Sequence, residues 1–167
     1  MEEFRFCPRC ARPLEEVRRG PDAGRPACPE GHFVHYGNPA VTVMAWIAEG
    51  EDFLLLQRAR EPKRLAWDLP GGFVEAGEHP HEAVRREVRE ETGLDVAPRR
   101  LIGIYPGTYG DGGKPTLDLA FLCRVRGGTF ALSPESLDAR WLPLTRFPAP
   151  AFASVRAALG DLRDRLG

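Results

Sequence analysis

Apolar residues recur in short runs from about position 40 onward. The runs over 41–47 and 53–58 are separated by Glu49-Gly50-Glu51-Asp52, a pattern typical of two strands joined as a β-hairpin. Later apolar runs predict three further strands, over residues 101–105, 117–125 and 139–142.

Two segments show helical spacing instead. Residues 149–166 carry Ala, Leu and Val at helical intervals, although Gly160 weakens the middle of this helix. The other helix is expected between Gly77 and Gly93, because Pro80 suits its first turn and Gly93 suits its C-terminal cap. The strands and helices do not alternate as in a doubly wound fold. The pattern therefore predicts a mixed β-sheet between helices.

The first of these helices places acidic residues beside its apolar stripe. At about 100° per residue, one sector of roughly 160° holds six residues in this order: Glu90, Ala83, Glu87, Glu91, Val84 and Val88. A solvated face would keep its acids away from the apolar stripe. Here three carboxylates crowd the edge that packs on the protein, and their mutual repulsion requires a cation.

Carboxylates in this arrangement suit Mg²⁺ or Mn²⁺, which take oxygen ligands and keep positions for water and substrate phosphates. Glu87 and Glu91 are four residues apart and Glu90 lies one turn from Glu87, so all three reach one small volume. Arg86, four residues before Glu90, can hold this acidic array in place. The implied substrate is a phosphate ester or anhydride.

A glycine pair precedes the helix in Leu69-Pro70-Gly71-Gly72-Phe73. An ordinary turn is one interpretation of such a pair. Glycine also lets the backbone come close to a ligand or an ion. Because this segment leads into the acidic helix, Gly72 is predicted to lie at the phosphate and metal edge of the site.

Residues 72–94 read GFVEAGEHPHEAVRREVREETGL and resemble, position for position, the Nudix box, G-x5-E-x7-R-E-U-x-E-E-x-G-U, where U is bulky and apolar. The resemblance implies an α/β/α sandwich with a mixed sheet and a metal-dependent hydrolysis of nucleoside diphosphates linked to another group. It also implies that Glu87, Glu90 and Glu91 are the ligand and base set, oriented by Arg86, with Glu78 in the outer metal shell. Glu87 and Glu91 both remain credible general bases.

The cysteines mark a second unit at the N-terminus. Cys7 and Cys10 form a C-x2-C pair, and Cys28 and His32 follow as C-x3-H after a 17-residue spacer. Such spacing is typical of a structural zinc site, with disulfides as the alternative. The segment resembles the zinc ribbon that precedes the catalytic domain in NADH pyrophosphatases, except that Gly31 replaces the fourth cysteine. His32 therefore completes the predicted site, with His35 as the alternative.

The zinc ribbon is expected over residues 1–38 and the Nudix domain over 39–167. With so few apolar residues, the first 38 positions need the metal in order to fold. The ribbon's role stays open between a dimer surface, a part of the nucleotide pocket and an adaptor for nucleic acid. Arg18, Arg19 and Phe33 form too small a basic and aromatic set to favour the adaptor.

Length and charge limit the remaining possibilities. The 167 residues carry a formal net charge of −1, so no overall basic field recruits nucleic acid. A small-molecule nucleotide is the expected partner, and a homodimer is compatible with the resemblance. No secretory signal peptide and no apolar run of membrane-spanning length is seen, which predicts a cytoplasmic protein without membrane contact.

Outside the box, Glu135 is a candidate metal ligand, because some Nudix enzymes take a further acid from a loop before a strand; an exposed loop acid is the alternative. An adenine ring needs an aromatic shelf, for which several side chains are available. The candidate substrate-binding residues are Arg58, Phe73, Tyr105 and Tyr109, with Trp46 and Trp67 as further aromatic residues.

The substrate stays open among NADH, NAD, ADP-ribose and similar dinucleotides or nucleotide sugars. The ribbon favours a dinucleotide, but the SQPWPFPxS segment of NADH pyrophosphatases is absent, and Pro106 and Pro115 miss the spacing of ADP-ribose enzymes. The alternative function is a noncatalytic nucleotide sensor or a zinc-ribbon adaptor for nucleic acid. His79 and His81 are expected at the surface, and Cys123 is expected to be a buried strand cysteine.

Overall fold

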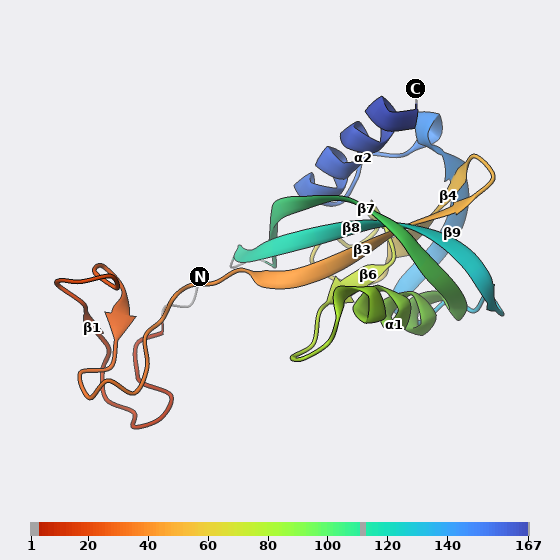
Figure 1. Cartoon of the computed structure of the whole chain (residues 1–167). Helices are drawn as coiled ribbons and strands as arrows, with labels where there is room; N and C mark the ends of the chain where they lie inside the picture. The colour runs from red at the N-terminus through yellow and green to blue at the C-terminus, as the bar shows by residue number, and fades with distance from the viewer. Residues whose placement is uncertain (1–3, 111–112, 167) are drawn as a thin grey trace. The chain divides into compact units, whose positions relative to one another are not determined.

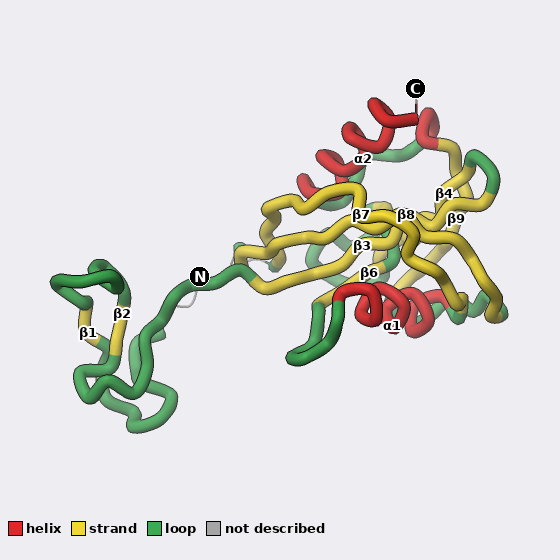
Figure 2. The backbone as a smooth tube through the Cα atoms, in the orientation of Figure 1, coloured by secondary structure: helices red, strands yellow, loops and turns green. Residues whose placement is uncertain are grey.

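The computed structural model describes residues 4–110 and 113–166. The chain forms two compact units, Met1–Asn38 and Pro39–Gly167. The smaller unit contains one short antiparallel pair, β1 (Glu15–Glu16) with β2 (Pro26–Ala27), and the rest of its described backbone is loops and turns (Figure 2). Among the described residues of this unit, Cys7 and Cys28 have buried side chains.

The larger unit combines a mixed seven-stranded sheet with helices on both of its faces (Figure 1). Its elements are β3 (Ala40–Glu49), β4 (Asp52–Arg58), β5 (Trp67–Asp68), β6 (Gly71–Phe73), α1 (Pro80–Thr92), β7 (Leu94–Tyr109), β8 (Lys114–Gly128), β9 (Ser136–Pro143), the 3-10 turn η1 (Leu144–Arg146) and α2 (Ala153–Leu166). This is the α/β sandwich expected from the sequence. In the part of the chain that the structure describes, no helix is long and apolar enough to cross a membrane.

The sheet opens between β3 and β4. The central strand β3 runs parallel to β8, from Ala40 opposite Thr116 to Ala48 opposite Arg124. Its hairpin with β4 pairs at only two positions before the strands separate. Beyond that point β6 pairs with β3 and β5 pairs with β4, so the short segment between β5 and β6 bridges the gap.

Two buried layers lie on the two faces of this sheet. On one face Val43, Ala45 and Ile47 of β3 pack with Ala83, Val84 and Val88 of α1. On the other face Met44 and Trp46 pack with Val155, Ala158, Leu159 and Leu162 of α2. This alternation along β3 is the two-residue period of a strand that is covered on both sides. Full burial of Val84 and Val88 stabilises the fold by about 1.5–3 kcal/mol each.

Local signals define both ends of α1. At its start, Nδ1 of His79 accepts a hydrogen bond of 3.2 Å from the His81 amide, and Pro80 occupies the first turn. At its end, Gly93 adopts the left-handed conformation with φ of 70°, and its amide bonds to the Arg89 carbonyl. The Thr92 hydroxyl donates 2.6 Å to the Val88 carbonyl, which satisfies a buried polar group.

The structure confirms the predicted strands and the β3–β4 hairpin, but it corrects several boundaries. The predicted strand over 101–105 is the middle of the longer β7. The predicted loop over 69–73 ends in the short strand β6. The final helix begins at Ala153, not at Ala149, because Pro150 forms a parallel bridge with Trp67 and the Ala151 amide bonds to the Trp67 carbonyl.

Gly93 caps the end of α1, and Gly160 lies inside α2. Replacement by alanine should change the free energy of unfolding in opposite directions at these two positions. In Gly93→Ala, the added Cβ would collide with the Thr129 carbonyl oxygen at a backbone φ of 70°, so we expect a loss of about 1–3 kcal/mol. In Gly160→Ala, nothing lies within 4 Å and the site is an exposed helix interior, so we expect a gain of about 0.5–1 kcal/mol. Urea unfolding of both variants beside the wild type measures the two changes. Equal effects in both would contradict the capping role of Gly93.

Candidate active site

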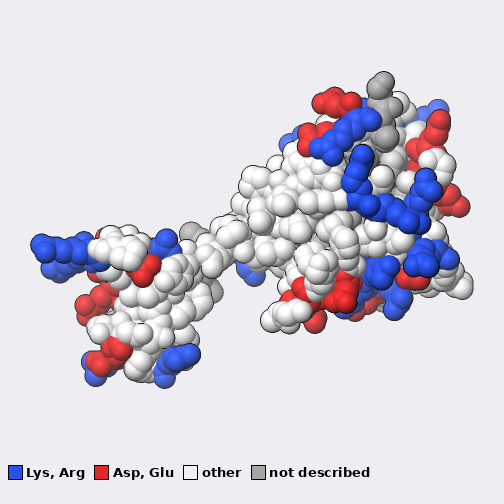
Figure 3. Space-filling model, viewed as in Figure 1, with Lys and Arg blue, Asp and Glu red and all other residues white. Residues whose placement is uncertain are grey.

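A cavity of about 450 Å³ lies where β3 and β4 separate. Its lining comes from both faces of the sheet: Glu87 and Glu91 from α1, and Phe152 and Val155 from the start of α2. Glycines of β6 form part of its wall. This volume falls within the range of sites that bind small molecules. Figure 3 shows acidic side chains gathered beside basic ones on the α1 side of the larger unit.

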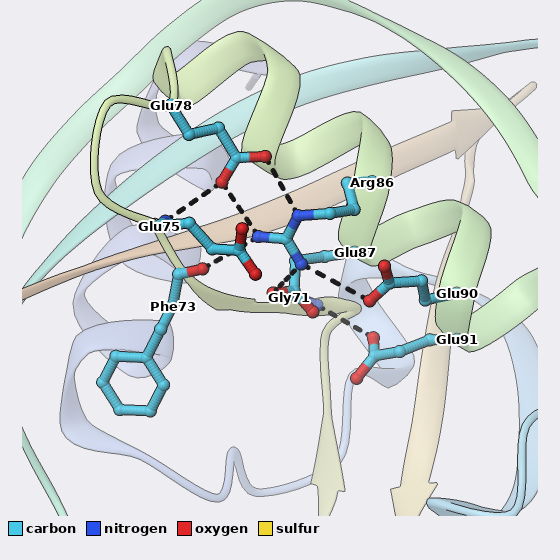
Figure 4. A network of polar contacts seen from close by, with 8 residues as sticks. All are labelled: Gly71, Phe73, Glu75, Glu78, Arg86, Glu87, Glu90 and Glu91. Atoms are coloured by element: carbon cyan, nitrogen blue, oxygen red, sulfur yellow. Dashed lines mark hydrogen bonds and ion pairs between the residues drawn. The ribbon is translucent and has the colours of Figure 1, made fainter.

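Arg86 holds the acidic residues of the loop and helix together (Figure 4). Its guanidinium donates two hydrogen bonds of 2.9 Å to the carboxylate of Glu78, one of 2.8 Å to Glu87 and one of 3.4 Å to Glu90. It also donates 3.0 Å to the Phe73 carbonyl, which ties the helix to β6. The fork geometry of arginine suits this role, because one planar group orients several acceptors at once.

Glu87 projects into the cavity against the glycine pair. Its side chain is 15% exposed, and burial raises its pKa, while the hydrogen bond from Arg86 acts in the opposite direction. A Cβ placed on Gly72 would lie 2.5–2.6 Å from the carboxyl atoms of Glu87. Gly72 therefore has to lack a side chain for this carboxylate to reach its position.

Glu91 is the more deeply buried acid of the pair. Its Oε2 accepts a hydrogen bond of 2.9 Å from the Gly71 amide. Burial raises its pKa to about 8; the Gly71 bond lowers the pKa, whereas the neighbouring charges of Glu87, Asp68 and Glu135 raise it further. A carboxyl group in such an environment favours either a proton or a cation beside it.

Glu78 and Glu90 lie outside the lining of the cavity in the described structure. Glu78 accepts from both Arg86 and the Glu75 amide, and the Arg86 bonds lower its pKa. The Glu90 side chain is 61% exposed. These two residues surround the guanidinium, whereas Glu87 and Glu91 face the cavity.

Glu135 reaches the cavity from another direction, in the loop that leads into β9. It forms a 3.0 Å ion pair with Arg60, and its side chain is 58% exposed. This places it in the same cavity as the acids of α1, as a loop residue that solvent can reach.

The donor chemistry of these residues fits Mg²⁺ or Mn²⁺, because the described lining of the cavity contains several carboxylates and neither cysteine nor histidine. The carboxylates do not form a compact group: three or more potential ligand atoms come within 4.8 Å of one another only in the N-terminal cysteine cluster, over residues 4–110 and 113–166. Arg86 lies between Glu78, Glu87 and Glu90 and bridges them through its guanidinium.

Three of the four predicted substrate-binding residues line the cavity, namely Arg58, Phe73 and Tyr109. Tyr105 does not, because its hydroxyl donates 2.8 Å to Asp161 of α2 and its ring is buried in the core. Trp46 is also a core residue, packed against Phe53 and Phe147. Trp67 lies under the guanidinium of Arg140.

Several cavity residues were not predicted from the sequence. Asp68 forms a 3.1 Å ion pair with Arg58, and burial raises its pKa to about 6. Asp118 is 8% exposed and accepts 2.5 Å from the Thr42 hydroxyl. Phe152 stacks on Tyr109. One sequence signal was available for Asp118, since it is an acidic residue within the apolar run of β8.

The smaller unit brings Cys7, Cys10, Cys28 and His32 together, with one ligand atom of each within 4.8 Å of the others. The Sγ atoms of Cys10 and Cys28 are 3.6 Å apart, well beyond a disulfide bond, and all three cysteines are free. Three thiols and an imidazole suit zinc. His35 lies outside this group and packs beside Phe4, with ring centroids 4.8 Å apart.

The remaining reactive side chains lie where the sequence predicted. His79 and His81 are exposed at the start of α1. Cys123 is fully buried, and burial raises the pKa of its thiol to about 12. It is a core residue without nucleophilic character.

Comparison with known proteins agrees with this geometry. The NUDIX domain family model matches residues 38–161. The ADP-ribose pyrophosphatase of Methanocaldococcus jannaschii is 36% identical over 117 residues, which cover 70% of this chain and 69% of that protein. The NAD-capped RNA hydrolase NudC of Stutzerimonas stutzeri is 32% identical over 166 residues, which cover 97% of this chain but 56% of that protein.

The human 8-oxo-dGDP phosphatase NUDT18 is 36% identical over 66% of this chain, which corresponds to 34% of that protein. The chain thus spans about a third of NUDT18 and about half of NudC. Among solved structures, a NUDIX hydrolase from Nitrosomonas europaea aligns with a TM-score of 0.75 and 28% identity, over 96% of this chain and 89% of that one. The family match, the fold and the acids of α1 together show that this chain belongs to the Nudix hydrolase family.

Proposed function

We propose that this Nudix hydrolase is a metal-dependent pyrophosphohydrolase that cleaves the diphosphate linkage of a nucleoside diphosphate joined to another group. The observation that carries the proposal is the position of Glu87 and Glu91, which present two carboxylates to one cavity beside the glycines of β6. Acids that served only α1 would face solvent. Glu87 and Glu91 instead face a cavity of about 450 Å³, which is large enough for a small-molecule ligand.

The proposed roles follow from where each residue lies. Mg²⁺ or Mn²⁺ would neutralise the negative charge that develops on the diphosphate. Glu87, Glu91 and Glu135 line the cavity and are the proposed ligands, with Gly72 at the metal edge of β6. Glu78 and Glu90 are proposed as outer members of the shell, because Arg86 links both to Glu87.

Water activation is assigned to the pair Glu87 and Glu91. A general base has to lie within hydrogen-bond reach of the attacking water, and both carboxylates face the cavity. The raised pKa of each group also raises its basicity once it is ionised. The proposal therefore names the pair and leaves the choice between its two members to kinetics.

The proposed substrates are ADP-ribose, NAD or NADH, and similar dinucleotides or nucleotide sugars. Support comes from two relatives, an ADP-ribose pyrophosphatase and an NAD-capped RNA hydrolase. The cavity adds an aromatic wall of Phe73 and Tyr109, whose rings lie 5.4 Å apart, and a cationic group in Arg58.

Replacing Glu87 by Gln should abolish most of the activity. We expect turnover with Mg²⁺ or Mn²⁺ to fall by at least about a hundredfold, because a ligand or base carboxylate is removed. The assay incubates the protein with ADP-ribose, NAD, NADH, diadenosine polyphosphates, coenzyme A and nucleotide sugars, and identifies products by mass spectrometry. Glu82→Gln is the matched control, since Glu82 is an exposed acid of the same helix. Binding without cleavage by the wild type would instead indicate a nucleotide sensor.

Glu135→Gln should separate catalysis from stability. An exposed ion pair with Arg60 contributes about 0–1 kcal/mol, so the melting temperature should stay nearly constant. Turnover should fall if the carboxylate contacts the metal ions, and Arg60→Gln serves as the control that breaks the same ion pair. Full activity of Glu135→Gln would remove this residue from the site.

We also propose that the smaller unit is a zinc ribbon that binds one Zn²⁺ through Cys7, Cys10, Cys28 and His32. The support is the convergence of four ligand atoms within 4.8 Å and the thiol and imidazole chemistry of the set. A unit with so few buried side chains gains most of its folding free energy from such a metal.

Metal analysis of protein purified without chelator should give about one zinc per chain. Cys10→Ser should remove the metal, and His32→Ala should weaken its retention during dialysis. His35→Ala is the matched control, because His35 lies outside the ligand group. Loss of zinc in His35→Ala with retention in His32→Ala would instead assign the fourth ligand to His35.

A further inference from the structure

A second cavity, of about 730 Å³, adjoins the active-site cavity. Its walls come from the β4–β5 loop, from β7 near residues 106–108 and from the start of α2. Thr108 and Phe152 line both cavities, so one elongated molecule can occupy the two together. The described lining of the second cavity contains none of the carboxylates that the catalytic proposal uses. Its chemistry is therefore different from that of the first.

The ring of Phe152 forms the boundary between the two cavities. The guanidinium carbon of Arg58 lies 5.2 Å from the centre of this ring, and Tyr109 stacks on it with ring centroids 6.0 Å apart. Arg58 and Tyr109 line the first cavity and lie outside the described lining of the second. These contacts hold the ring in place, so the passage between the cavities has a fixed wall.

Two basic side chains from different elements line the second cavity, Lys63 of the β4–β5 loop and Arg156 of α2. Both are exposed, and in the described parts of the chain neither belongs to an ion pair. Glu61 is the one acid of the described lining, and its carboxylate accepts from the Arg64 amide at 3.5 Å. The cavity thus carries more positive than negative side chains.

The β4–β5 loop fixes the backbone of Lys63 at the edge of this cavity. Lys63 and Leu65 have φ of 63° and 71°, in the left-handed region that residues with a side chain seldom adopt. The Nε of Arg58 donates 2.8 Å to the Pro62 carbonyl. The Ala66 amide donates 3.1 Å to the Lys63 carbonyl. Such conformations persist where the surrounding structure imposes them, and they gather at sites that bind ligands.

The start of α2 adds to the positive potential of the cavity. Ala153, the first residue of α2, belongs to the lining, and the first turn of this helix carries no acidic side chain. The N-terminal end of a helix has a partial positive charge. This charge reinforces Lys63 and Arg156, which supply the hydrogen-bond donors for an anion.

We propose that the second cavity is a subsite for a further phosphate group of the substrate, which Lys63 and Arg156 bind. The inference rests on the proposed function, because it narrows the substrates to nucleoside diphosphate derivatives that carry an additional phosphate monoester. NADP, with this phosphate on a ribose 2′-oxygen, and coenzyme A, with it on a ribose 3′-oxygen, share this chemistry. NAD and dephospho-coenzyme A are the counterparts that lack it.

Phosphate matches this cavity through its charge and its number of acceptors. Its oxygens take several charge-assisted hydrogen bonds, so donors from two elements can hold one group. The chain has a formal net charge of −1, so no overall field attracts an added negative charge. The carboxylates of the first cavity repel such a charge. A preference for the phosphorylated substrate would therefore report a local site.

The test compares kcat/KM within two matched pairs, NADP with NAD and coenzyme A with dephospho-coenzyme A, in the presence of Mg²⁺ or Mn²⁺. In at least one pair we expect kcat/KM to be about tenfold higher for the phosphorylated member, as for hydrogen bonds to a charged group. The preferred pair shows which ribose oxygen carries the phosphate. High salt should reduce the preference, because both cations are exposed. Equal or lower kcat/KM for the phosphorylated member of both pairs would overturn the proposal.

Variants identify the groups responsible. In Lys63→Gln and in Arg156→Gln, the ratio of kcat/KM within the preferred pair should fall about threefold or more, because each removes one exposed charge from the subsite. Arg64→Gln is the matched control and should keep the ratio, since Arg64 is an exposed cation of the same loop outside the described lining. The ratio is taken within one preparation, so a partial loss of folded protein does not change it. An unchanged ratio in either cavity variant would contradict the assignment.

Failure of the proposed function would be recognised separately, by calorimetry of the same pairs on the full chain without divalent metal. If no compound is cleaved, yet the phosphorylated member of a pair binds about tenfold more tightly, the catalytic proposal fails and the phosphate subsite stands. If both members of each pair are cleaved equally well, the subsite fails and the catalytic proposal stands. Absence of both cleavage and a difference in binding would refute the two together.

Discussion

The larger unit depends on the close approach of the α1 carboxylates to the glycine backbone of β6. Glu91 accepts the Gly71 amide at 2.9 Å, and the carboxyl group of Glu87 occupies the space that a side chain at position 72 would fill. The same turns of α1 bury Val84 and Val88 in the core. One helix therefore satisfies two demands, because its apolar and acidic positions adjoin, and packing of the first set places the second at the cavity.

The burial of Glu91 beside the cavity lowers the free energy of unfolding when this carboxylate is ionised. Burial raises the pKa of Glu91 from 4.5 to about 8, so its protonated form stabilises the fold below the unfolded pKa, and this contribution is lost as the pH rises through the folded value. Near neutral pH and above, ionised Glu91 is increasingly unfavourable unless a cation lies beside it. Arg86 relieves Glu78 and Glu87 but makes no hydrogen bond to Glu91 in the described structure. Glu91, the acid with the greatest need of a counter-charge, is thus one of the two α1 acids that face the cavity.

The α1 half of the cavity could be predicted from the sequence because its geometry is local: helical spacing places Glu87 and Glu91 on one side of the helix, whereas Glu90 lies outside the lining. The α2 half could not, since Phe73, Thr42 and Asp118 meet only through the register of three strands. Tyr105 and Tyr109 both lie in β7, yet only Tyr109 reaches the cavity, because Tyr105 turns to Asp161 of α2. Hydrophobic patterns predicted the positions of the strands, but they do not specify which residues of distant strands lie opposite one another.

The separation of β3 from β4 joins these two halves. The acids of α1 pack on one face of the sheet, and Asp118 and Phe152 belong to the other, so a continuous sheet would keep them apart. The hairpin pairs at only two positions, and the cavity lies in the gap that follows. A shift of one residue between β3 and β8 would move Thr42 out of line with Asp118. Helix α1 would remain intact, but Thr42 and Asp118 would no longer line one cavity with its acids. The polar groups on the α2 side of the cavity thus depend on sheet register, whereas the acids of α1 depend on the spacing within a single helix.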